Sequence, residues 1–86
     1  MAFNVSVVNS CKLISVRGGR YDVTSTQADV VFTNVITASS YTAVMNYDAA
    51  TGRGSINVPV SSLAESNGVW RVCIVEQGLE KACKPL

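Results

Sequence analysis

The residues with the clearest chemistry in this 86-residue chain are its three cysteines, Cys11, Cys73 and Cys83. Three cysteines allow at most one internal disulfide and leave one thiol over. Cys73 and Cys83 lie on the two arms of a predicted C-terminal hairpin. A three-residue loop over 77–79 would place them directly opposite each other, whereas a loop of two or four residues would turn them to opposite faces. We therefore expect a Cys73–Cys83 disulfide, with three reduced thiols as the alternative.

No catalytic set accompanies these thiols in the sequence. A nucleophilic cysteine needs a neighbouring base or surroundings that favour the thiolate, and the chain has no histidine. Three sulfurs without paired C-x₂-C spacing make a poor zinc site. Glu76 and Glu80 flank the last predicted turn, but paired catalytic carboxylates need a cleft, so we interpret them as solvated. The sequence predicts a protein that is not an enzyme and that uses no metal or cofactor.

Two arginine–glycine segments are candidate contact loops. Segments 17–20 and 51–54 carry Arg17, Arg20 and Arg53 beside glycines. Neither matches the phosphate-binding loop, which needs G-x-x-x-x-G-K-[ST] before a helix. If both loops lie at one end of the molecule, they could bind an anion or a sugar acid. The simpler interpretation is that glycine permits the hairpin turn and arginine keeps its tip soluble.

Tyr41 and Tyr47 are the candidate residues for stacking on a sugar ring. They fall on one face of a predicted strand, because side chains two positions apart share a face. Ala43 and Met45 lie on that same face, which favours a core position for the tyrosines. The tyrosine pair therefore motivates a glycan-binding hypothesis and, beside it, a purely structural one.

Alternation of apolar and polar residues with a period of two dominates the chain and predicts strands. It is clearest over 54–60, where Ile56, Val58 and Val60 share one face. Pro59 cannot donate to a ladder, which places this strand at a sheet edge or a bend. The predicted strands cover 3–8, 12–16, 30–36, 41–47, 54–60, 69–75 and 79–84.

Residues that favour turns separate these strands. They lie at 9–10, 17–20, 38–40, 48–54, 67–68 and 77–78. Helical signal is confined to a capping-box pattern over 62–65, with room for about one turn. We therefore expect an all-β fold, an antiparallel β-sandwich or a small barrel of about seven strands, in a single domain over 1–86.

The segment 61–73 resembles the corner that precedes strand F in immunoglobulin-like and fibronectin-type sandwiches. After Leu63 come a polar turn, a glycine, an aromatic residue and a strand that holds Cys73. The family's corner tyrosine would fall at position 71, which is Arg71 here. The resemblance implies an immunoglobulin-like sandwich and an alternative disulfide, Cys11–Cys73, across the core. It implies no function for any single residue.

The composition narrows the classes of partner. Net charge is +1 and charged residues make up 15% of the chain, against about 25% in ordinary domains. This is too neutral for an electrostatic nucleic-acid binder. Apolar stretches fall far short of the roughly 20 residues of a membrane-spanning helix, and the first residues do not form a signal peptide. We expect neither nucleic-acid binding nor membrane insertion.

These features together favour a non-catalytic structural or interaction module. Low charge favours association, and sheet edges with few charges leave strand addition from another chain available. We expect a subunit of a larger assembly that contacts itself or other protein subunits, such as a phage virion component or an extracellular filament. Disulfide chemistry without a signal peptide favours the virion. The alternative is a small sandwich that binds glycans or another small ligand.

Overall fold

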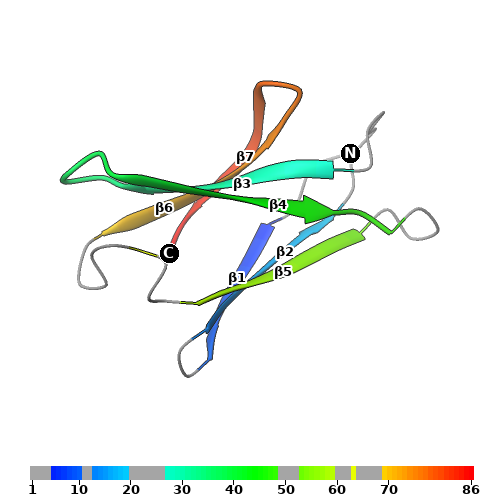
Figure 1. Cartoon of the computed structure of the whole chain (residues 1–86), viewed down its shortest axis with the longest axis horizontal. Helices are drawn as coiled ribbons and strands as arrows, with labels where there is room; N and C mark the ends of the chain where they lie inside the picture. The colour runs from blue at the N-terminus through cyan, green and yellow to red at the C-terminus, as the bar shows by residue number, and fades with distance from the viewer. Residues whose placement is uncertain (1–4, 11–12, 20–26, 49–52, 60–62, 64–68) are drawn as a thin grey trace.

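The structure is a computed structural model that describes residues 5–10, 13–19, 27–48, 53–59, 63 and 69–86. Within these residues all regular secondary structure is β-strand, which confirms the all-β prediction (Figure 1). The strands are β1 (Val5–Ser10), β2 (Leu13–Gly19), β3 (Gln27–Asn34), β4 (Ser40–Asn46), β5 (Arg53–Pro59), β6 (Trp70–Glu76) and β7 (Leu79–Pro85).

The strands form two antiparallel sheets that face each other, as in a β-sandwich (Figure 1). One has three strands in the order β1-β2-β5, and the other has four in the order β4-β3-β6-β7. The chain crosses between the sheets after β2, β4 and β5. An isolated bridge between Tyr47 and Gly54 joins the end of β4 to β5. Because β5 is an edge strand, the edge position predicted from Pro59 is confirmed.

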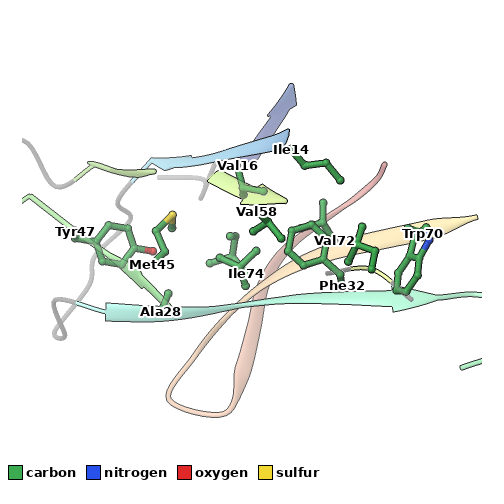
Figure 2. Close-up of a cluster of buried hydrophobic side chains, with 12 residues drawn as sticks. Ile14, Val16, Ala28, Phe32, Met45, Tyr47, Val58, Trp70, Val72 and Ile74 are labelled. Carbon is green, nitrogen blue, oxygen red and sulfur yellow. The ribbon is translucent and has the colours of Figure 1, made fainter. Parts of the chain in front are cut away.

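The hydrophobic core lies between the sheets because alternation turns one face of each central strand inward. In β3, Val30 and Phe32 are buried whereas Asp29 is exposed. Side chains of β2 and β5 meet those of β3 and β6 in a single cluster (Figure 2). Its buried members are Ile14, Val16, Ala28, Val30, Phe32, Met45, Tyr47, Val58, Leu63, Trp70, Val72 and Ile74.

Two predicted turns are wrong where the structure describes them. Ser10 pairs with Leu13 and Gly19 pairs with Arg53, so β1 and β2 continue through residues assigned to turns. The cause is not local. Glycine has low β propensity, but the pairing of Gly19 with Arg53 in β5, and of Ser10 with Leu13 in β2, keeps both residues extended.

Gly54, which the sequence placed both at the end of the turn over 48–54 and at the start of the strand over 54–60, lies in β5 and packs closely against the end of β4. A Cβ added there would lie 2.8 Å from the backbone oxygen of Asn46 and 3.0 Å from Met45 Cγ. Asp48 N–H also donates to the Arg53 carbonyl oxygen at 2.7 Å. Glycine is therefore required here by close backbone packing between the sheets.

Several predictions fall on residues that the structure does not describe. The turn at 67–68 and the capping-box pattern at 62–65 lie outside the described residues, apart from Leu63, which is buried in the core. Cys11 and Arg20 are also outside them.

Candidate functional site

The hairpin of β6 and β7 carries the only disulfide among the described residues, between Cys73 and Cys83. Its turn has two residues, because Glu76 pairs with Leu79. Gln77 has a φ of 53° and Gly78 a φ of 78°. Positive φ at both central residues matches the twist of a two-residue hairpin. The turn predicted at 77–78 and the Cys73–Cys83 disulfide are therefore both confirmed, whereas the three-residue loop over 77–79 that would have aligned the cysteines is not what the structure has.

A β-bulge reconciles the short turn with the disulfide. Val75 pairs with Glu80 but Ile74 pairs with Ala82, so Lys81 is an extra residue in β7. The one-residue shift brings Cys83 opposite Cys73, with 4.1 Å between their Cα atoms. An extra residue of this kind reverses the inward and outward alternation of the residues beyond it. Without it, the two-residue turn would leave the cysteines on opposite faces.

The Cys73–Cys83 bond excludes the alternative disulfide, Cys11–Cys73, since Cys73 forms only one. The bridge also lies on the outer face of the four-stranded sheet and not across the core. Cys73 follows Val72 and precedes Ile74, which both point into the core. Strand alternation therefore turns Cys73 outward.

An exposed ion pair borders this disulfide. Arg71 Nη2 lies 3.5 Å from Glu80 Oε2, and the same oxygen lies 3.5 Å from Cys83 Sγ. Cys73, Cys83 and Glu80 place three potential metal donors within 4.8 Å of one another. Metal binding requires thiolates, and these two sulfurs are bonded to each other. The cluster is therefore a structural one in this oxidised form.

Glu76, interpreted from sequence as solvated, is buried at 4% exposure. It lies on the inward side of β6, whereas Glu80 is exposed on β7. The two carboxylates flank the same turn but do not face one another. The structure therefore brings together no carboxylate pair at this turn.

Of the three candidate loop arginines, the structure describes Arg17 and Arg53, and both lie in strands rather than at loop tips. Arg17 in β2 pairs with Ser55, and Gly19 pairs with Arg53 at the start of β5. Both arginines are exposed, and the register places them diagonally on the outer face of the three-stranded sheet. The structure thus brings the two segments side by side. Anion binding there stays a prediction.

The two candidate stacking residues face the core. Tyr47 is 8% exposed, and Tyr41 is half-buried with its ring centroid 6.2 Å from that of Phe32. Figure 2 shows Tyr47 beside Met45 in the core cluster. This placement offers no open aromatic platform, and the glycan hypothesis gains no support from it.

The sequence placed the turn between β3 and β4 at 38–40, whereas the structure begins it directly after Asn34, and sequence reasoning missed the part that the Asn34 side chain plays in it. Asn34 is buried at 1% exposure, and its Oδ1 accepts the backbone N–H of Ile36 at 2.9 Å and of Thr37 at 3.1 Å. The Asn34 N–H donates to the Ser39 carbonyl oxygen, and the Ala38 N–H donates to the Asn34 carbonyl oxygen, each at 2.8 Å. Together these bonds hold the turn in one conformation.

Val35 and Ile36 in this turn, and Val69 beside it, expose apolar side chains to solvent, and we call these three residues the apolar tip. They are 61%, 76% and 57% exposed. Val35 N–H donates to the Val69 carbonyl oxygen at 2.9 Å, which fixes Val69 beside the turn. The apolar run from Val30 to Ile36 had predicted a continuous strand. The asparagine within it was the signal for a turn, since asparagine favours turns over strands.

Comparisons with protein-family models, with curated proteins and with solved structures return no match to this chain. Among the residues that the structure describes, no helix is long and apolar enough to cross a membrane.

Proposed function

We propose that this chain is a non-catalytic structural and interaction module, a subunit of a larger assembly that contacts a neighbouring protein through the apolar tip. The observation that carries the proposal is the exposure of Val35, Ile36 and Val69 on a turn held by the Asn34 side chain. Clustered exposed apolar side chains on a small protein are typical of interaction sites.

The rigidity of the turn supports this role. Ordering a flexible loop on binding opposes association, so a turn already held by hydrogen bonds loses less entropy when it docks. Ile36 projects farthest into solvent, at 76% exposure. It is the residue that would enter a pocket on the neighbouring protein.

The strand order supports an immunoglobulin-like type of sandwich. In such folds the strands called C, F and G share a sheet, and C′ adds beside C. Here β3, β6 and β7 share a sheet and β4 adds beside β3. The setting we propose is a phage virion or an extracellular filament, where a surface with little charge packs against other subunits and disulfides persist.

The test of this function is the solution mass of the chain and of an Ile36→Lys variant, from about 1 µM to 1 mM. We expect the native chain to form assemblies that grow with concentration, and Ile36→Lys to shift them to smaller species, because a charge cannot be buried unpaired in an apolar contact. The control is Ser6→Lys, which adds the same charge at an exposed position of β1. Identical masses for native chain and Ile36→Lys would contradict a role for the tip in self-assembly.

A further inference from the structure

The edge strands of the two sheets differ in how they are protected. Exposed edges offer unpaired backbone groups to other chains, and natural proteins block them with charges, proline or bulges. Edge strand β7 has all three: Glu80, Lys84 and Pro85, and a bulge at Lys81. A second chain would therefore pair poorly with β7.

The edges of the three-stranded sheet carry similar blocks. Edge strand β5 begins with Arg53 and ends with Pro59, which has no N–H to donate. On β1, the Lys84 Nζ lies 3.5 Å from the Val5 carbonyl oxygen and donates to it. Each of these strands therefore carries at least one group that interferes with strand addition.

Edge strand β4 (green in Figure 1) carries none of these blocks. Its sequence SYTAVMN contains no charged residue and no proline, and its register with β3 runs without a bulge from Ser40 to Asn46. Val44 is 53% exposed. Gly54 lies against the far end of β4, near the Asn46 carbonyl oxygen. Among the residues that the structure describes, the part of this edge that pairs with no second strand is therefore 40–44.

The hydrogen-bond alternation shows which backbone groups face outward along this edge. Asn34 N–H donates to the Ser39 carbonyl oxygen, and in an antiparallel pair every second residue bonds to the neighbouring strand. Tyr41 and Ala43 therefore bond to β3. Ser40, Thr42 and Val44 direct their N–H and C=O groups away from it.

The open segment 40–44 can pair antiparallel with the same segment of a second chain. In an antiparallel pairing centred on Thr42, the two Thr42 residues lie opposite each other, Tyr41 lies opposite Ala43, and Ser40 opposite Val44. Cross-strand threonine pairs are favourable, and like charges facing each other are not. The segment contains no charges, and a net charge of +1 per chain gives two copies little cause to repel.

We propose that β4 pairs antiparallel with β4 of a second copy of this chain, about a twofold axis at Thr42, so that the two four-stranded sheets become one continuous sheet. This rests on the proposed function as an assembly subunit and deepens it by naming the edge and the partner. The apolar tip is left exposed by this pairing, available for a different contact.

The experiment is a charge exchange at Thr42, an exposed residue on the outer face of β4. Thr42→Lys places two lysines directly opposite each other in the dimer, and Thr42→Glu places two glutamates there. Sedimentation should show each variant alone dimerising at least about tenfold more weakly than the native chain, because like charges face each other. An equimolar mixture of the two should recover a heterodimer, because opposite charges then face each other.

Three control measurements test whether the loss of dimer is specific to β4. Ser6→Lys should dimerise like the native chain, since it adds the same charge on β1. Fluorescence of the single tryptophan, Trp70, and circular dichroism confirm that each variant is folded. Ile36→Lys should still dimerise, because it alters the apolar tip and not the edge. Loss of larger assemblies with retention of the dimer would thus separate the two contacts.

The results that would reject the β4 pairing differ from those that would reject the proposed role of the apolar tip. A native chain that stays monomeric to about 1 mM, a Thr42→Lys variant that dimerises like the native chain, or a mixture that fails to recover a dimer would each reject the β4 pairing. If the native chain stays monomeric, a strand that pairs with the β4 edge would have to come from a different protein. In the second and third, self-assembly through the tip would still be open to the Ile36→Lys test.

Discussion

Asn34 is the single residue on which the local structure of the apolar tip depends. Its side chain is buried at the end of β3, and its Oδ1 accepts two backbone N–H groups of the turn. A buried donor that loses its acceptor must be desolvated without compensation, which destabilises the folded state. Asn34 therefore links the stability of the core to the shape of the proposed contact.

Substituting Asn34 by alanine should lower the free energy of unfolding by about 1–3 kcal/mol, because two backbone N–H groups lose their acceptor. Urea denaturation followed by tryptophan fluorescence measures this. Gln27→Ala is the control, since it removes an exposed hydrogen bond to Asn46 at the start of the same strand and should change little. Equal losses in the two variants would show that the turn does not depend on Asn34.

At the scale of the element, the β6–β7 hairpin shows how a disulfide and a bulge depend on each other. The two-residue turn at Gln77 and Gly78 sets one register, and Lys81 shifts it by one residue before Cys83 is reached. The cross-link then ties the edge strand β7 to the buried strand β6. This matters because β7 contributes mostly exposed side chains, so packing alone holds it weakly.

Breaking the Cys73–Cys83 bond should lower the free energy of unfolding by about 3 kcal/mol, the value expected from the chain entropy of a loop this short. Denaturant midpoints with and without reductant measure the effect, with thiol titration to confirm reduction. A Cys11→Ser variant is the control and should respond to reductant like the native chain. An unchanged midpoint after complete reduction would contradict a stabilising role for the bridge.

At the scale of the whole molecule, stability depends on one core shared by both sheets. Phe32 is fully buried at the centre of β3 and is surrounded by residues from several strands (Figure 2). A small domain buries a modest fraction of its surface and is therefore marginally stable. Damage to this cluster should loosen both sheets together.

Phe32→Ala should lower the free energy of unfolding by about 3–5 kcal/mol, through lost burial and the cavity left behind. This is a large part of the roughly 5–15 kcal/mol of a typical domain. Thermal unfolding followed at Trp70, which is 4% exposed, measures it. Val8→Ala, at a 45% exposed position on β1, should cost far less. A similar loss in both variants would contradict a single shared core.

The sequence by itself predicted which faces of the strands are buried, because a period of two depends only on the alternating geometry of an extended chain. In β5, Val58 is buried and Ile56 is half-buried, on the face that the alternation predicted. Pro59 indicated an edge strand, since proline lacks a donor wherever it sits. Cys73–Cys83 was the disulfide expected from the places of the two cysteines on the last hairpin, although their alignment depends on the bulge at Lys81.

Only the tertiary structure decided where strands end, where the register shifts, and which strand lies at which edge. These depend on ladder bonds between strands that are distant in the chain, as in the pairing of β3 with β6. A bulge at Lys81 has no signature in alternation, because it interrupts that alternation. The open edge of β4 likewise exists only because β3 takes its place between β4 and β6, and a sequence read segment by segment does not contain that order.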